Sequence, residues 1–80
     1  MTPDERNATV HRTLAAVLGV PESKINDDTS PDSYPAWDSV AHLNLVMALE
    51  EAFGTSFTPE ETMDMTSVKL IRLLLEEKGL

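Results

Sequence analysis

One segment limits most strongly what this 80-residue chain can fold into: residues 39–53 read as one helix with apolar residues on two faces. Counting about 100° per residue from Val40 predicts one broad core-facing arc, made of Leu45, Val46, Leu49, Ala52 and Phe53. Val40, Leu43 and Met47 lie on nearly the opposite side, interleaved with polar residues. Either a bundle of further helices buries this second arc, or it is a surface for a partner.

A first helix is predicted from residue 2 onward. The sequence Thr2-Pro3-Asp4-Glu5 offers an N-cap threonine, a proline at the first helical position and a glutamate placed to complete a capping box. Apolar residues then recur at helical spacing, namely Val10, Leu14, Val17 and Leu18. Gly19 is a natural helix end.

Residues 20–38 form an unusually long connection, rich in proline and in turn-forming residues. Such a long segment in a compact domain is normally functional, disordered or wrongly assigned. Ile25, Tyr34 and Trp37 are apolar enough to hold this segment against the core. We therefore expect it to be an ordered loop.

Gly54 ends the helix predicted over residues 39–53, and two more helices are predicted after it. Thr58-Pro59-Glu60-Glu61 repeats the cap-plus-proline signature and predicts a short helix through residue 63. Thr66 or Ser67 then caps a last helix, whose inward residues are Val68, Ile71, Leu74 and Leu75. No segment alternates in the manner of a strand. The sequence predicts one all-α domain over residues 1–80: a small four-helix bundle of three longer helices and one short helix, with a long loop between helices one and two.

Composition excludes several classes of function. The chain has 14 acidic and 6 basic residues and a formal net charge of −8, which repels nucleic acids and anionic lipid surfaces. It has no cysteine, so no thiolate of its own can act as nucleophile or metal ligand. No apolar run approaches the roughly 20 residues of a membrane span, and residues 1–5 lack the regions of a signal peptide. We expect a monomeric, cytoplasmic protein that binds neither nucleic acid nor membrane.

Ser39 and its surroundings resemble the acyl carrier protein family. The residues that carry the resemblance are Asp38-Ser39-Val40, Leu43, Leu45-Val46-Met47-Ala48-Leu49-Glu50-Glu51 and Phe53-Gly54. In that family, the serine of an Asp-Ser-Leu motif carries a 4′-phosphopantetheine arm, and here Val40 replaces the leucine. The resemblance implies that Ser39 is the covalent attachment point. It also implies that Asp38 helps to engage the modifying enzyme and its magnesium ion.

The family also has a recognition face on the helix that follows the serine. By position, this face corresponds to Val40, Leu43, Asn44, Met47 and Glu51. The implied partners are a phosphopantetheinyl transferase and the acyl-loading and acyl-processing enzymes, which would dock through basic patches. Ala41 and Asn44 stand where carriers of fatty-acid synthesis usually have acidic residues. This departure favours a specialised, polyketide-like or secondary-metabolite pathway over a general fatty-acid pathway.

The same residues also have plain structural interpretations. A serine at a helix start usually caps the helix, and Asp38 suits a first-turn acidic cap. His42 falls toward the core on the helical wheel, so it is interpreted as a partly buried structural histidine that also lines the entrance of any acyl cavity. No base and orienting group surround Ser39, so no enzyme activity is expected. No residues have metal-ligand spacing, so no metal site is expected.

The sequence thus favours an acyl carrier protein that holds its cargo as a thioester and delivers it to other enzymes. The start at Met1 and the short segment after the last helix favour a free-standing carrier over one domain of a multienzyme. Two alternatives remain. One is an aminoacyl or peptidyl carrier protein, and the other is an unmodified helical protein-interaction module that docks through residues 39–53.

Overall fold

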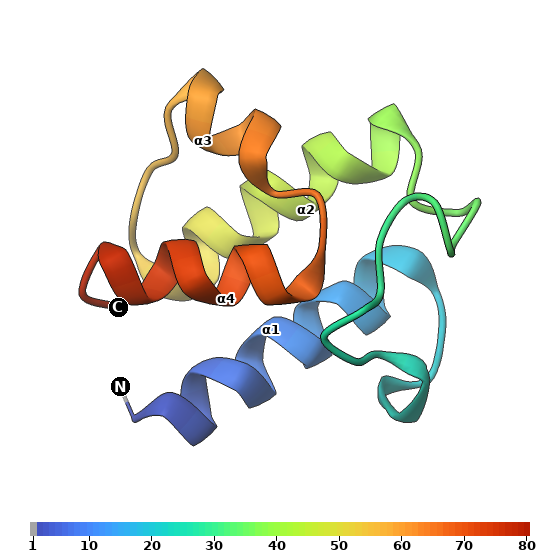
Figure 1. Cartoon of the computed structure of the whole chain (residues 1–80), viewed down its shortest axis with the longest axis horizontal. Coiled ribbons are helices and arrows are strands. Elements are labelled where there is room, and N and C mark those ends of the chain that lie inside the picture. The colour runs from blue at the N-terminus through green and yellow to red at the C-terminus, as the bar shows by residue number, and fades with distance from the viewer. Residues whose placement is uncertain (1) are drawn as a thin grey trace.

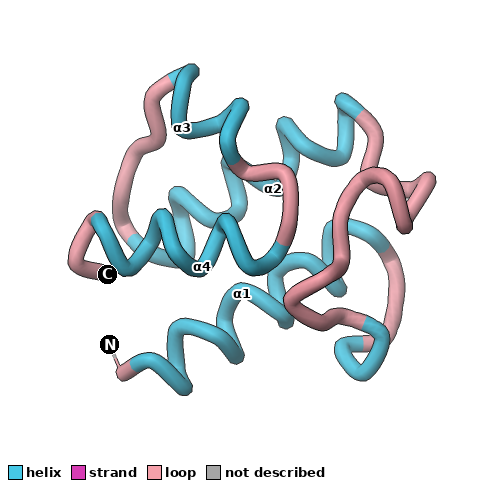
Figure 2. Tube along the Cα trace, viewed as in Figure 1, coloured by secondary structure: helices cyan, strands magenta, loops and turns pink. Residues whose placement is uncertain are grey.

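Four α-helices and one short 3-10 helix make up the computed structural model, which describes residues 2–80 (Figure 1). The elements in chain order are α1 (Pro3–Leu18), the 3-10 helix η1 (Glu22–Lys24), α2 (Ser39–Phe53), α3 (Pro59–Asp64) and α4 (Val68–Glu77). No strand occurs within residues 2–80 (Figure 2). The predicted all-α fold, with three longer helices and a short one, is confirmed. None of the helices within this range is long and apolar enough to cross a membrane.

The helix ends lie close to where the capping signals predicted them. Gly19 and Gly54 adopt left-handed φ angles of 70° and 61° and end α1 and α2. Thr58 and Glu61 form a complete capping box around the start of α3. Ser67, rather than Thr66, caps α4, because its side chain accepts a hydrogen bond from the amide of Leu70. Side chains near each helix thus satisfy backbone groups that the helix itself leaves unpaired.

The predicted capping box at the start of α1 is only half formed. The Thr2 hydroxyl accepts from the Glu5 amide at 3.2 Å, as expected. The Glu5 carboxylate, however, accepts from the Thr2 hydroxyl at 3.2 Å instead of from the Thr2 backbone amide. A rotating hydroxyl can both accept and donate, so the two side chains satisfy each other locally.

The core lies between α1, α2 and α4, because α1 packs against both other long helices. Figure 1 shows α3 on the other side of the molecule from α1. The largest fully buried side chains are Val10, Leu14, Leu45, Leu49, Met65, Val68, Ile71 and Leu75. Three long helices therefore supply most of the core, the connecting segments add Ile25, Trp37 and Met65, and α3 contributes no buried residue.

Most of the predicted core arc of α2 is confirmed. Leu45, Val46 and Leu49 are buried and Phe53 is half-buried. Ala52 is exposed, so its assignment to the core was wrong. It lines an open groove between α1 and α2 whose other lining residues are Arg12, Thr13, Ala16, Val17, Ala48 and Glu51. The alanine side chains here are too short to close the gap between the two helices.

The segment between α1 and α2 is held by buried side chains and by bonds to α4. Ile25 and Trp37 are buried and Tyr34 is half-buried, as predicted. The carbonyl oxygens of Asp27 and Thr29 accept from the first amides of α4, at 3.2 and 3.0 Å. The Asp27 carboxylate also pairs with Arg72 of α4 at 2.7 Å. Backbone and side-chain bonds thus fix the path by which the chain reaches α2.

Arg6 is buried in α1, which the sequence pattern did not reveal. Its guanidinium donates to the carbonyl oxygen of Leu80 at 2.7 Å and to the Glu76 carboxylate at 2.9 Å. The start of α1 and the end of α4 therefore lie together on one side of the molecule (Figure 1). Bonds to charged groups of this kind are stronger than those between neutral groups.

Leu45 and Leu43 provide a matched test of the two arcs of α2. Leu45 is fully buried, whereas the Leu43 side chain is 62% exposed. We expect Leu45→Ala to lower the free energy of unfolding by about 2–5 kcal/mol, since it removes buried methyl groups and leaves a cavity. Leu43→Ala should change it by only about 0.5 kcal/mol or less. Urea denaturation followed by circular dichroism measures both, and equal losses would contradict this placement of the core.

Candidate functional site

Ser39 is the first residue of α2, and Asp38 is the N-cap. The Asp38 carboxylate accepts a hydrogen bond from the Ala41 amide at 2.9 Å. The interpretation of Asp38 as an acidic cap is therefore confirmed, and the interpretation of Ser39 as the cap is wrong. Because Asp38 already occupies the capping position, the Ser39 side chain is exposed and its hydroxyl has no hydrogen-bond partner within residues 2–80.

The start of α2 suits a negatively charged group beside Ser39. Within the described residues, the amides of Ser39 and Val40 have no hydrogen-bond acceptor, whereas the Ala41 amide is taken by Asp38. Free amides at a helix start point along the positive end of the helix dipole. Such an arrangement favours phosphate and other anions. The negative charge of Asp38 disfavours an anion here, so the two free amides supply the attraction for a negative charge.

A cleft of about 620 Å³ opens beside Ser39, between α2 and the segment that contains α3. Its lining residues are Pro31, Trp37, Asp38, Ser39, His42, Leu43, Thr62, Met63, Met65 and Thr66. Most of the lining is apolar. A group attached to the Ser39 hydroxyl would thus leave the protein at the edge of an apolar cleft.

His42 is half-buried, as predicted, and forms part of the cleft wall. The Trp37 indole nitrogen donates to His42 Nδ1 at 3.0 Å, and the two rings stack with centroids 6.1 Å apart. His42 Nε2 lies 2.9 Å from the carbonyl oxygen of Thr62. Since an indole nitrogen can only donate, Nδ1 must be the acceptor and Nε2 carries the proton. Both nitrogens are therefore engaged, and neither is available to take a proton from Ser39.

The two methionines near α3 differ in their surroundings. Met65 is fully buried, as expected of a residue that fills the core. Met63, by contrast, is 76% exposed and lies outside the core, although methionines beside a short helix more often fill one. It lies on the outer side of a helix of only six residues, where no other helix covers it. Both methionines nevertheless line the cleft, together with Thr62 and Thr66, and no sequence signal assigned any of these four residues to a cleft.

The second apolar arc of α2 faces solvent. Val40, Leu43 and Met47 are 67%, 62% and 59% exposed, and their polar neighbours Asn44 and Glu51 are exposed as well. These five residues are called the α2 strip below. The interpretation in which the bundle buries both arcs is wrong, because α3 is too short to cover this face and packs against α4 instead. The structure thus places an uncovered apolar surface on the helix that begins at Ser39.

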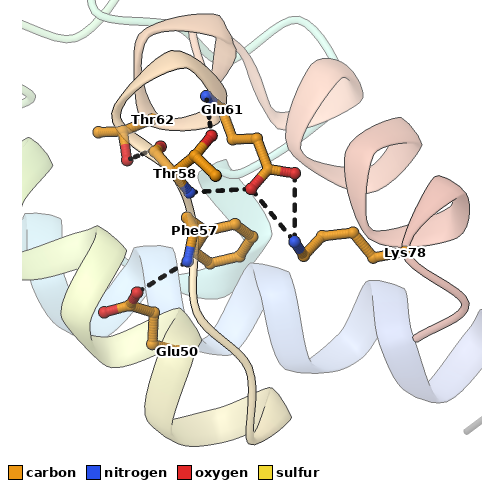
Figure 3. A network of polar contacts seen from close by, with 6 residues as sticks. All are labelled: Glu50, Phe57, Thr58, Glu61, Thr62 and Lys78. Carbon is orange, nitrogen blue, oxygen red and sulfur yellow. Dashed lines mark hydrogen bonds and ion pairs between the residues drawn. The ribbon is translucent and has the colours of Figure 1, made fainter.

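A polar network holds the start of α3 (Figure 3). The Glu61 carboxylate accepts from the Thr58 amide at 2.9 Å and pairs at 3.1 Å with Lys78, the C-cap of α4. The Glu50 carboxylate of α2 accepts from the Phe57 amide at 2.9 Å. The hydrogen bond from the Thr58 amide, and then the contact with Lys78, lower the pKa of Glu61 below its ordinary value.

A comparison with protein-family models decides the family of this chain. The model of the phosphopantetheine attachment site matches residues 8–75, which is most of the chain. The protein belongs to this family. It is therefore a phosphopantetheine carrier protein, whose prosthetic group is 4′-phosphopantetheine held covalently on a serine. Carriers of this family interact with a phosphopantetheinyl transferase and with pathway enzymes, and they are generally non-catalytic.

Glu61→Gln tests the network that holds α3. A lowered carboxyl pKa stabilises the fold at a pH above the ordinary value of 4.5, and this contribution disappears as the pH falls through the lowered pKa. The glutamine keeps an acceptor for the Thr58 amide but loses the charge that faces Lys78. We expect the variant to be less stable than the wild type at neutral pH, with the difference shrinking as the pH falls below 4.5.

Urea denaturation at a series of pH values measures this difference. Glu60→Gln is the control, because the neighbouring Glu60 side chain is exposed and makes no hydrogen bond within residues 2–80. A loss of stability for Glu61→Gln that is the same at neutral and acidic pH would show that the charge of Glu61 is not what matters.

Proposed function

We propose that this carrier is an acyl carrier protein and that Ser39 is the serine that bears its 4′-phosphopantetheine arm. The observation that carries the proposal is the exposed, unbonded Ser39 hydroxyl at the start of a 15-residue helix and at the edge of an apolar cleft. The other serines are Ser23, Ser30, Ser33, Ser56 and Ser67. Ser30 and Ser33 bond within one turn, and Ser67 caps α4. None of these five lines the cleft.

The residues around Ser39 fit the arm. A phosphodiester on the Ser39 oxygen would lie near the free amides of Ser39 and Val40, which favour a negative charge. When bound, the arm supplies the terminal thiol that this cysteine-free chain lacks, and that thiol holds the cargo as a thioester. We propose that the exposed Asp38 has two roles: its carboxylate caps α2, and it helps to engage the transferase and its magnesium ion.

The α2 strip is the proposed docking surface for the transferase and for the enzymes that load and process the acyl group. Three exposed apolar side chains lie there on the same helix as Ser39, which would bring a partner bound at the strip close to the arm. Methionine suits such a surface, since its flexible side chain adapts to different partners. The net charge of −8 and the exposed Glu51 favour partners with basic patches.

The cleft favours an acyl cargo over an aminoacyl cargo. Its lining is mainly apolar, and the two polar nitrogens of His42 are already bonded within the protein. A charged amino group would lose hydration against these apolar side chains, whereas an acyl chain would not. We propose further that residues 1–80 form one carrier domain that serves a specialised, polyketide-like pathway, since Ala41 and Asn44 leave the start of α2 less acidic than in a fatty-acid carrier.

Ser39→Ala tests the attachment point directly. We expect the wild-type chain, incubated with coenzyme A and a broad-specificity phosphopantetheinyl transferase, to gain the mass of one phosphopantetheine group. The Ser39→Ala variant should gain none, because it lacks the hydroxyl oxygen that forms the phosphodiester. Ser56→Ala is the matched control, since it removes another exposed serine and should be modified like the wild type. Intact-protein mass spectrometry measures all three.

Modification of the folded Ser39→Ala variant would overturn the assignment of Ser39. If the folded and initially unmodified wild type gained no mass with several transferases, the carrier proposal itself would fail. The remaining interpretation would then be a helical interaction module that docks through α2.

Met47→Glu tests the docking surface. The Met47 side chain is 59% exposed, so the charge should not disturb the core. We expect roughly tenfold weaker binding to the transferase, because an apolar contact is replaced by a charge that must lose its hydration. Leu70→Glu, on the exposed face of α4, is the control and should bind like the wild type. Titration calorimetry measures binding, and circular dichroism shows whether Met47→Glu still folds.

A further inference from the structure

Two adjacent residues in the middle of the short helix α3 bond it to its neighbours. None of its six residues is buried, and a helix of this length is not stable on its own. Glu61 pairs at 3.1 Å with Lys78, the C-cap of α4. The Thr62 carbonyl oxygen lies 2.9 Å from His42 Nε2, the one hydrogen bond between α2 and α3 within residues 2–80. The buried Met65 follows directly after α3.

The contact with His42 adds a second, shorter hydrogen bond to the Thr62 carbonyl oxygen. Thr62 is near the end of the helix, where carbonyl oxygens lose their regular helical donors. The Met65 amide donates to this oxygen at 3.4 Å, whereas His42 Nε2 lies only 2.9 Å from it. Because Trp37 donates to Nδ1, the proton must lie on Nε2, and it points at the Thr62 carbonyl. Trp37 thus fixes the His42 tautomer that carries its proton on Nε2 and can bond to α3.

These contacts lie within the walls of the cleft. Trp37 and His42 line one side, and Thr62, Met63 and Met65 line the other. We propose that His42 is a positioning residue that holds α3 as a movable wall of the cleft beside Ser39, so that breaking its bond to Thr62 opens the cleft. The role of the cleft as the place for a carried acyl group rests on the proposed function. The role of His42 in holding α3 does not.

Three substitutions at position 42 separate the two bonds of the ring. His42→Phe keeps a flat ring and removes both bonds. His42→Gln places an amide nitrogen near the position of Nε2, so it keeps a donor for the Thr62 carbonyl. His42→Asn places an oxygen near the position of Nδ1, so it keeps an acceptor for Trp37 and loses the bond to α3. The glutamine and asparagine variants are therefore a matched pair.

Amide hydrogen exchange on the unmodified protein provides the test. We expect the amides of residues 62–65 to exchange roughly three- to tenfold faster in His42→Phe and His42→Asn, the range that corresponds to loss of one ordinary hydrogen bond. In His42→Gln, the rates should stay close to those of the wild type. The amides of α1 are the internal reference, since a rise there would report general destabilisation.

Equal exchange in the glutamine and asparagine variants would overturn the proposal, and so would wild-type exchange in His42→Phe. If His42→Phe does not fold, the matched pair still decides the matter. None of these outcomes depends on Ser39 being modified, so failure of the proposed function would not be mistaken for failure of this inference.

A second measurement follows the loaded carrier. The wild type, His42→Gln and His42→Asn would be loaded from an acyl-coenzyme A of medium chain length, and the thioester would be cleaved with hydroxylamine. We expect cleavage to be severalfold faster in His42→Asn than in the other two, because an open cleft exposes the thioester and its acyl chain to reagent. Equal cleavage rates in all three would overturn the claim that α3 closes the cleft over the cargo.

Discussion

The rotational register of α2 is the constraint on which the rest of this structure depends. Asp38 fixes where the helix begins, by accepting the Ala41 amide, and Gly54 fixes where it ends. With both ends set, Leu45 and Leu49 must face the core, while Met47 faces outward. The same register brings Ser39 to the edge of the cleft. A rotation of α2 about its axis would move the core residues, the α2 strip and Ser39 together. The core and the position of Ser39 therefore depend on the same helix register.

Much of the fold was predictable because its signals are local. Cap residues, helix-start prolines and left-handed glycines act within one turn of the chain, and helical spacing identified Leu45 and Leu49 as core residues. The exposure of the α2 strip did not follow from the sequence, since a sequence does not state how far neighbouring helices extend. The shortness of α3 decided that question. Ala52 was misplaced because the arc predicts a direction, whereas burial also needs a neighbour large enough to fill the gap.

The contacts that join distant segments had no sequence signal. Arg6 reaches Glu76, and the Thr62 carbonyl reaches His42 across the cleft. An arginine on a helix usually lies in solvent, and a backbone carbonyl has no identity in a sequence, so neither pairing follows from residue type. His42 was recognised as partly buried from its place on the helical wheel, but its two partners and hence its proton position emerge only when the loop and α3 are brought together.

The bond between Trp37 and His42 has a practical consequence. Trp37 is the only tryptophan of the chain, and it is 3% exposed in the wall of the cleft. The near-ultraviolet fluorescence of the native protein therefore arises mainly from one indole. The residues around this indole form the cleft wall that a bound acyl group would displace. The intensity and the emission maximum of this fluorescence report on the cleft without an attached dye. Both can be followed in real time while other proteins bind and release the carrier.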